Sequence, residues 1–289
     1  MKTMKGKRVV ITGPTSGIGK EIAVQLADLG AELILGCRDL EKGKQTVMEI
    51  ADRTGSSNAV VMHIDASSQQ SIREFAQEVR KKYRRLDVLI NNARGNRDTL
   101  PKIDSVDGIE LTFATNVLGY FLLTQELLSL LEKSAPACIV NVASSFASDL
   151  DLDDLQFERR PFESFKAYAQ SKACNRLLTW ALARRLDGSS VTVNAMTPGL
   201  VAETGLYRNA STELVDRLRG YGAGRTSAQG ADTAVWLASS PEVEGISGKF
   251  YGDRNVIKCE FRNKKDEEKL WGICESLIKQ VGPVAGGIG

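Results

Sequence analysis

Residues 8–19 have the sequence RVVITGPTSGIG, in which a β-branched run is followed by a cluster of glycines. The run Arg8–Thr12 is typical of a strand buried on both faces of a parallel sheet. Apolar residues then recur at helical spacing from about Gly17 onward, namely Ile18, Ile22, Leu26 and Leu29. Glycine permits a sharp turn and a close approach of the backbone to a phosphate, at which helix amides point. Such a strand–helix junction predicts a dinucleotide site formed by Gly13, Thr15, Ser16, Gly17, Ile18 and Gly19.

The alternation of strand and helix continues along the chain. Strands are predicted at 8–12, 33–35, 60–64, 86–90, 138–142, 191–195 and near Phe250, and further helices at 39–52, 68–83, 113–131, 168–186, 228–237 and 265–278. Ser67 is the predicted N-cap of the helix at 68–83. Strands that alternate with helices form βαβ units with a parallel sheet. We therefore expect an α/β fold, a doubly wound parallel sheet of the Rossmann type, in a single domain at 1–280 with a flexible tail at 281–289.

Composition excludes several classes of function. The chain has 289 residues, 42% of them hydrophobic and 26% charged, and a formal net charge of +2, so we expect no nucleic-acid partner. No apolar run resembles a signal peptide or a membrane span. The five cysteines are scattered and there is one histidine, which predicts no metal site and reduced thiols in a cytoplasmic protein.

Several further motifs follow the glycine cluster in a fixed order. They are Asn91-Asn92-Ala93 after the fourth strand, Asn116 in the next helix, Ser144 after the fifth strand, Tyr168 and Lys172 in a YxxxK pattern, and Pro198-Gly199 after the sixth strand. With the GxxxGxG spacing at 13–19, this set resembles the short-chain dehydrogenase/reductase family. Cys37-Arg38-Asp39 and the segment at 237–250 are similar to its retinol-dehydrogenase-like branch.

The resemblance implies a catalytic group of four residues. Tyr168 is the general acid when a carbonyl is reduced and the general base in the reverse reaction, and Lys172 also holds the nicotinamide ribose. Ser144 hydrogen-bonds the carbonyl oxygen, which gains negative charge as hydride adds. Asn116 holds a water for proton relay; a polar residue that kinks the helix is the alternative for this position. Tyr168 and Lys172 are four residues apart and share one helix face, where a bare pair of this kind is usually solvated.

The end of the second strand bears on the choice of cofactor. An NAD site usually has an acidic residue there, whereas this chain has Cys37 followed by Arg38, whose guanidinium suits a 2′-phosphate. We therefore expect NADP(H) rather than NAD(H). In the alternative, Arg38 only pairs with Asp39 or Glu41 at the surface. The resemblance places Asp65 at the adenine edge, where helix capping is its other role. Asn92, Tyr168, Lys172, Pro198 and Gly199 complete the predicted cofactor contacts.

Two positions depart from the family pattern. Arg94 replaces the glycine of NNAG, and either points outward or enters the site to meet a phosphate or an acidic substrate. Glu203 stands where a threonine or serine is common, with Thr204 one residue later. Substrate-loop segments are expected near 146–166, where aromatic residues either wall a lipophilic pocket or form a small satellite core, and near 203–224.

The predicted function is that of an NADPH-dependent oxidoreductase, which interconverts a carbonyl and an alcohol on a small lipophilic substrate with Tyr168 as acid and base. Two alternatives remain: a catalytically inactive dinucleotide-binding regulator, and a reductase of a carbon–carbon double bond. The resemblance also implies a homodimer that pairs through the helices near 113–131 and 168–186. Internal core packing explains their apolar residues equally well.

Overall fold

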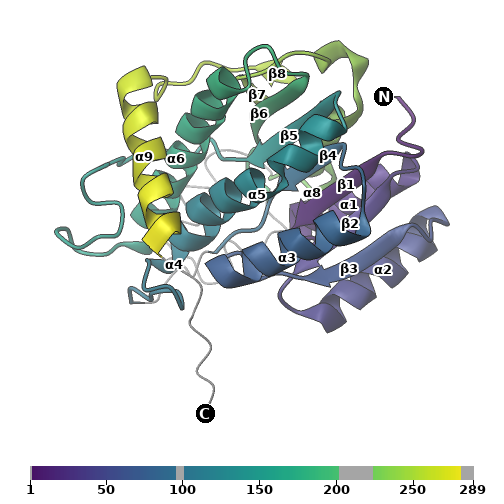
Figure 1. Ribbon diagram of the computed structural model, residues 1–289, viewed down its shortest axis with the longest axis horizontal. Coiled ribbons are helices and arrows are strands. Elements are labelled where there is room, and N and C mark those ends of the chain that lie inside the picture. Colours follow the sequence, from purple (N-terminus) through teal and green to yellow (C-terminus); the bar gives the residue numbers. More distant parts are fainter. Residues whose placement is uncertain (1, 96–100, 202–223, 281–289) are drawn as a thin grey trace.

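The computed structural model describes residues 2–95, 101–201 and 224–280 and shows strands and helices in alternation (Figure 1). The strands are β1 (Arg8–Thr12), β2 (Glu32–Cys37), β3 (Ala59–His63), β4 (Val88–Asn91), β5 (Ala137–Val142), β6 (Val191–Thr197), β7 (Phe250–Gly252) and β8 (Asn255–Val256). The helices are α1 (Gly17–Asp28), α2 (Leu40–Thr54), α3 (Gln69–Lys82), α4 (Leu111–Phe113), the π-helical turn η1 (Ala114–Leu118), α5 (Gly119–Lys133), α6 (Ser164–Arg185), α8 (Ser227–Ser239), the 3-10 turn η3 (Pro241–Val243) and α9 (Lys264–Gln280).

These strands form one eight-stranded sheet in the order β3-β2-β1-β4-β5-β6-β7-β8. Strands β1 to β7 are parallel, which confirms the predicted Rossmann-type sheet. The sequence predicted a parallel sheet, and the short β8, which is antiparallel to β7, is the exception. The strand order reverses between β1 and β4, and a doubly wound sheet binds its ligand outside the carboxyl ends of the strands at such a point.

Helices cover both faces of the sheet because successive strand residues point to opposite sides. Val9 and Ile11 of β1 belong to the core under α1, α2 and α8, whereas Val10 belongs to the core under α3, α5 and α6. The last helix, α9, packs against α6, and its Trp271 meets Phe121 of α5 edge-on with ring centroids 4.8 Å apart. Residues of α5 and α6 thus contribute to internal core, and homodimer formation through these helices stays a prediction.

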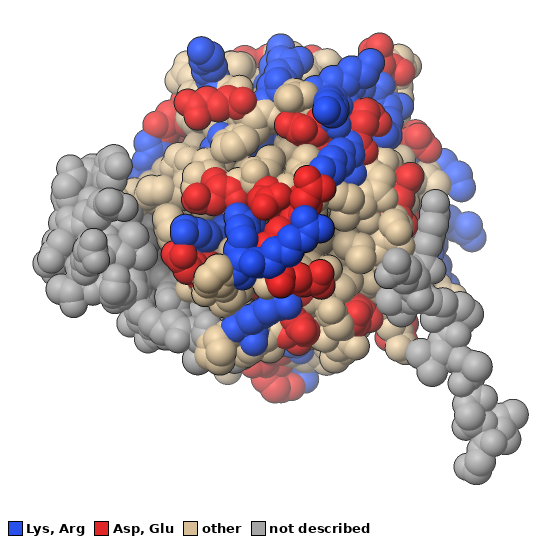
Figure 2. All heavy atoms as spheres, turned by 90° about the vertical axis from the view of Figure 1, so that its left-hand side faces the viewer, with Lys and Arg blue, Asp and Glu red and all other residues tan. Residues whose placement is uncertain are grey.

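The outer side of α9 is polar. Figure 2 shows this side of the molecule, where positive and negative side chains are interspersed. Ion pairs connect α9 to neighbouring elements, among them Arg185–Glu268 at 2.6 Å and Lys269–Asp153 at 2.7 Å. No helix among the described residues is long and apolar enough to span a membrane.

Several predicted boundaries were wrong by a few residues. Helix α6 begins at Ser164, four residues before the predicted start, and the segment expected as one helix at 113–131 is divided into α4, η1 and α5. The N-cap of α3 is Ser68, whose side chain accepts from the Ser71 amide, and not Ser67. The expected tail at 281–289 lies outside the described residues.

Candidate active site

The glycine-rich turn after β1 is held against the end of β4. The Thr12 hydroxyl oxygen accepts from the amides of Asn92 and Ala93, both at 3.0 Å. The Asn92 side-chain amide donates to the carbonyls of Thr12 and Gly13 at 2.9 and 3.0 Å. Asn92, which the sequence analysis assigned to the cofactor, therefore shapes the turn that precedes α1.

Close packing at this turn requires glycine at two positions. A Cβ on Gly13, which has a φ of +65°, would lie 2.9 Å from the Ala93 Cα atom. A Cβ on Gly19 would lie 2.2 Å from the Gly13 carbonyl oxygen. The N-cap of α1, Ser16, makes no side-chain capping hydrogen bond. The turn and the first amides of α1 therefore form a cradle that fits the pyrophosphate of a dinucleotide.

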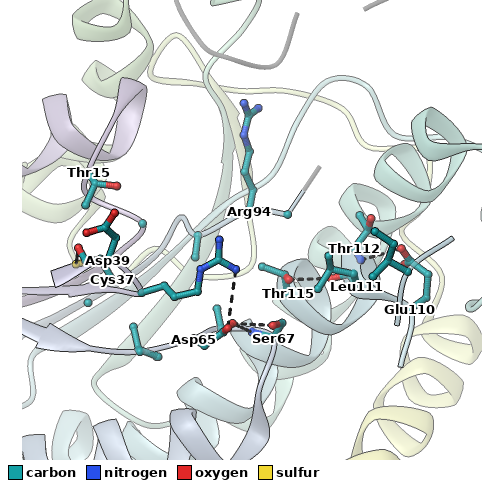
Figure 3. Close-up of a pocket in the computed structure, with 18 of the residues that line it drawn as sticks. Thr15, Cys37, Asp39, Asp65, Ser67, Arg94, Glu110, Leu111, Thr112 and Thr115 are labelled. Carbon is teal, nitrogen blue, oxygen red and sulfur yellow. Dashed lines mark hydrogen bonds and ion pairs between the residues drawn. The ribbon is translucent and has the colours of Figure 1, made fainter. Parts of the chain in front are cut away.

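A cavity of about 350 Å³ begins at this turn and follows the carboxyl ends of β2, β3 and β4 (Figure 3). Arg38 lies in its lining, and its guanidinium is 3.9 Å from the Asp65 carboxylate, an exposed pair that contributes little to stability. Arg38 thus pairs with Asp65, not with Asp39 or Glu41 as the alternative interpretation had it. Lys42 also lines the cavity, which the sequence analysis did not foresee.

Both acidic residues beside Arg38, Asp39 and Asp65, already accept hydrogen bonds from the protein. Asp39 caps α2 by accepting from the Lys42 amide at 3.0 Å, and this hydrogen bond lowers the pKa of the Asp39 carboxyl. Asp65 accepts from the Ser67 amide at 2.9 Å and from the Ser67 hydroxyl at 2.6 Å, so it closes the turn after β3 and does not cap α3. At the end of β2 the cavity therefore has two cations, Arg38 and Lys42, beside the Asp39 carboxylate, which already caps α2.

The predicted catalytic residues lie where β5 ends against α6. Ser144, Tyr168 and Lys172 are all buried. The Lys172 ammonium donates to the carbonyl of Val142, two residues before Ser144, at 2.9 Å, and lies 5.8 Å from the centre of the Tyr168 ring. This hydrogen bond fixes the middle of α6 against the end of β5. The Ser144 hydroxyl oxygen accepts from the Phe146 amide at 3.1 Å, which leaves its own hydrogen free to be donated.

The electrostatics of this corner are dominated by positive charge. Burial, with a smaller contribution from the nearby Arg94 guanidinium, lowers the pKa of Lys172 to about 7. Arg94 lines the cavity and is exposed, with no hydrogen bond or ion pair to any described residue. In Figure 3 its side chain extends away from Asp65 and Ser67. The same guanidinium also acts on Tyr120, whose hydroxyl is buried without a partner and has a pKa raised by burial.

Asn116 lies in the π-helical turn and is completely buried. Its side-chain oxygen accepts from the Gly95 amide at 2.8 Å and its side-chain nitrogen donates to the Ser171 hydroxyl at 3.0 Å. Its main-chain carbonyl accepts from the Asn175 side chain at 2.6 Å. Asn116 therefore interrupts the regular helix and also ties the loop after β4 to α6, next to Tyr168 and Lys172.

The loop after β6 is attached to the end of β5. The Thr197 hydroxyl oxygen accepts from the Ser145 amide at 3.0 Å and from the Gly199 amide at 3.3 Å. Pro198 lies between them, and Gly199 has a φ of +72° beside the Arg225 side chain. Glu203 and Thr204, and nearly all of the expected substrate segment at 203–224, lie outside the described residues.

The insert at 146–166 forms a small satellite core, one of the two roles that the sequence left open, and the lipophilic pocket wall stays a prediction. Phe157 is buried and meets Phe162 edge-on at 5.4 Å, and the buried Asp154 accepts from the amides of residues 158–160, so the segment has a small core of its own. Phe162 lines the cavity, together with Ser164 at the start of α6.

Besides Lys42, three residues of the site were missed by the sequence analysis. Glu110 lines the cavity and accepts from the amides of Thr112 and Phe113 at 2.8 and 2.7 Å, and burial raises its pKa. Tyr120 faces the Lys172 ammonium. Arg176 donates to the Ser144 carbonyl. All three lie outside the sequence motifs. For Arg176 a signal was available, because it follows Lys172 by four residues on the same helix.

Comparisons with known proteins agree with this geometry. A family model described as short chain dehydrogenase matches residues 7–214. Human retinol dehydrogenase 14 is 38% identical over 95% of this chain and 87% of its own length, and mouse retinol dehydrogenase 12 is 40% identical over 94% and 86%.

Solved structures share the fold. An uncharacterised protein from Mycobacterium paratuberculosis superposes with a TM-score of 0.77 at 29% identity, covering 96% of each chain. The Pseudomonas aeruginosa RhlG/NADP active-site complex superposes with a TM-score of 0.69 at 26% identity, covering 86% of this chain and 96% of its own.

Proposed function

The chain belongs to the short-chain dehydrogenase family, in its retinol-dehydrogenase-like branch, and we propose that it reduces small lipophilic carbonyl compounds with NADPH. The family makes it an oxidoreductase that interconverts carbonyl and alcohol groups with a nicotinamide dinucleotide. The observation that carries the finer proposal is the hydrogen bond from the buried Lys172 ammonium to the Val142 carbonyl. This bond attaches α6, which carries Tyr168 and Lys172, to the end of β5, which leads to Ser144.

The proposed chemistry divides between cofactor and chain. When bound, the dinucleotide supplies the hydride for reduction and accepts it in the reverse reaction. The Ser144 hydroxyl, whose oxygen already accepts from the Phe146 amide, donates to the carbonyl oxygen as negative charge develops there. Tyr168 gives its phenolic proton to the same oxygen. A cationic Lys172 nearby favours the phenolate that remains. In the oxidative direction the same groups act in reverse, with Tyr168 as base.

Burial of these groups serves the same reaction. A buried phenol and a buried ammonium interact in surroundings that contain little water, so their mutual charge effects are larger than at a surface. Gly13 and Gly19 support the binding of a dinucleotide because a Cβ at either position would collide with the chain's own atoms, so only glycine lets the turn close tightly in front of the first amides of α1. Asn116 connects the loop after β4 to helix α6 through its hydrogen bonds to Gly95 and Ser171, and so fixes the position of the loop relative to the helix.

A substrate screen tests the activity. The protein is incubated with NADPH and a panel of aldehydes and ketones, and the loss of NADPH absorbance is followed by identification of the product. An alcohol product supports the proposal, whereas a saturated carbonyl product assigns the chain to reduction of carbon–carbon double bonds. Tight NADPH binding without turnover of any carbonyl would favour the inactive regulator.

Tyr168→Phe tests the mechanism within the same assay. We expect kcat to fall by about 100- to 10,000-fold because the proton donor is lost. NADPH affinity should stay nearly constant, since the ring and Lys172 remain. Tyr83→Phe removes a phenol at the far end of α3 and is the matched control. Undiminished turnover by the Tyr168 variant would refute its assignment as the acid.

The preference for NADPH is supported by Arg38 and Lys42, which both line the cavity at the end of β2. Asp39, the carboxylate next to Arg38, also lines the cavity, and its Oδ1 is engaged in capping α2. We expect Arg38→Asp to weaken NADPH by about 10- to 100-fold, because a charged hydrogen bond is replaced by repulsion, and to leave NADH affinity nearly constant. Lys44→Asp makes the same charge change on α2 outside the cavity lining. Equal losses for both cofactors would exclude a 2′-phosphate contact.

The lipophilic character of the substrate is supported by the insert at 146–166. Phe162 reaches the cavity, and Phe146 meets Phe165 edge-on with centroids 6.1 Å apart. A series of linear aldehydes of increasing chain length measures this preference. The specificity constant kcat/KM should rise with each added methylene until the pocket is filled. A constant or falling value along the series would contradict an apolar pocket.

A further inference from the structure

Arg176 is a buried cation that the proposed mechanism does not use. It follows Lys172 by one turn of α6, so that Tyr168, Lys172 and Arg176 share one face of the helix. Its side chain is only 5% exposed. No carboxylate of the described residues pairs with it, in contrast to Arg184 on the same helix, which pairs with the buried Glu267.

The contacts of the Arg176 guanidinium are specific. One terminal nitrogen donates to the main-chain carbonyl of Ser144, and the other donates to the Cys259 sulfur at 3.5 Å. The guanidinium lies 4.0 Å from the centre of the Phe250 ring and 5.8 Å from that of Phe261. Its remaining nitrogen, Nε, is buried without a hydrogen-bond partner.

Stability alone gives little reason for an arginine here. A buried charge without a counter-ion loses its hydration, and an unpartnered donor adds to this cost. An apolar side chain of similar length would fill the same space between Phe250 and Phe261 without either penalty, and the loss would be the bond to the Ser144 carbonyl. The presence of an arginine here is therefore better explained by the hydrogen bond that it donates to the Ser144 carbonyl.

That peptide belongs to a turn in which each neighbouring group has one partner. The Ser145 amide donates to the Thr197 hydroxyl at 3.0 Å, and the Phe146 amide donates to the Ser144 hydroxyl at 3.1 Å. The Ser144 carbonyl has Arg176 as its partner. Without Arg176, the peptide between Ser144 and Ser145 would keep the hydrogen bond that its N–H donates to Thr197 but lose the hydrogen bond that its carbonyl accepts. The direction of the Ser144 hydroxyl would then be less well determined.

We infer that Arg176 is a positioning residue, which holds the Ser144 peptide from behind so that the Ser144 hydroxyl points at the oxygen of the substrate. This inference rests on the proposed carbonyl reduction. A group misplaced by about 1 Å can lose about 100-fold in rate, and a positioning defect therefore lowers kcat while leaving cofactor binding intact.

The test compares Arg176→Met with wild type in the NADPH assay. Methionine is unbranched and apolar, and keeps most of the packing volume. We expect kcat to fall by about 10- to 100-fold, because Ser144 is less well placed. The dissociation constant of NADPH, measured by fluorescence, should change by less than about threefold. Tm should change little, because loss of the bond to the Ser144 carbonyl offsets removal of an unpaired buried charge. Arg185→Met is the matched control, since Arg185 also lies on α6 and stacks on an aromatic ring, that of Trp271, at 3.8 Å. It should leave kcat unchanged.

Arg176→Lys provides a second variant that keeps the charge. A lysine ammonium can reach one acceptor but lacks the planar fork, so we expect kcat between those of wild type and Arg176→Met. If the methionine variant does not fold, a lysine variant with wild-type kcat would overturn the inference, and one with lowered kcat and unchanged NADPH affinity would support it.

The outcomes separate this inference from the proposed function. An inactive wild-type protein, or an active Tyr168→Phe variant, would contradict the carbonyl reductase itself. An active wild type together with a folded Arg176→Met variant of equal kcat would overturn only the role of Arg176. A large loss of Tm in Arg176→Met with kcat retained would assign Arg176 to stability.

Discussion

Replacing Lys172 by methionine should change how the stability of the protein depends on pH. Burial lowers the pKa of Lys172 to about 7, and Arg94 contributes to the same effect. In the unfolded chain a lysine titrates near about 10.4. Between these two values the unfolded chain binds one more proton than the folded protein. Stability therefore rises with pH in this window, which is the reverse of the behaviour of a lysine whose pKa is raised by folding.

The size of the effect follows from the proton difference. One proton gives a slope of at most about 1.4 kcal/mol per pH unit. From about pH 7.5 to about pH 9.5 the wild type should therefore gain about 2–3 kcal/mol relative to Lys172→Met, because methionine does not titrate. The thiols of Cys138 and Cys174, whose pKa values are raised by loss of solvent around them, act in the opposite direction but are common to both proteins.

Urea denaturation followed by tryptophan fluorescence measures these free energies, in the absence of cofactor. The quantity of interest is the difference between wild type and variant at each pH. Lys166→Met is the control on the same helix; the hydrogen bond that Lys166 donates to the Glu163 carboxylate raises the pKa of Lys166, so any trend should have the opposite sign. A difference that stays constant with pH would show that Lys172 remains protonated in the folded protein, and the argument from burial would fail.

Two other predictions concern the cofactor cleft. Arg94→Gly should raise the pKa of Lys172, because a neighbouring positive charge is removed, and the pH at which stability begins to rise should move upward in the same denaturation experiment. Gly19→Ala should weaken NADPH binding by at least about tenfold, since the new Cβ would lie 2.2 Å from the Gly13 carbonyl oxygen and the turn must move. Gly272→Ala in α9, where nothing lies within 4 Å, is its control and should leave NADPH affinity unchanged.

The sequence predicted best what depends on near neighbours along the chain. The run at 8–12 and the glycines at 13–19 identified β1, its turn and the start of α1 because backbone conformation there is dictated locally. The alternation of strands and helices predicted the doubly wound sheet for the same reason. Helix ends were less certain: α6 begins at Ser164, where Glu163 is in an extended conformation, and the YxxxK motif lies one turn inside the helix.

What the sequence did not predict depends on contacts between distant segments. The π-helical turn at Ala114–Leu118 contains the Asn116 carbonyl, which accepts from Asn175, 59 residues later. Arg176 meets Cys259 across 83 residues and is part of no motif. The antiparallel β8 is two residues long, too short for a recognisable alternation of apolar side chains. Such features follow from packing, which a reading of local patterns does not include.

Helix α6 shows two ways in which the fold accommodates positive charge. Near its end Arg184 and Arg185 pair with Glu267 and Glu268 of α9, so that each cation has an anion of the same chain beside it. In the middle Lys172 has no such partner among the described residues, and burial lowers its pKa instead. The ion pairs between α6 and α9 neutralise charge within the chain, whereas Arg94, which lines the cavity, has no ion-pair partner among the described residues and leaves a positive potential there. A polyanionic dinucleotide is the kind of ligand that this potential favours.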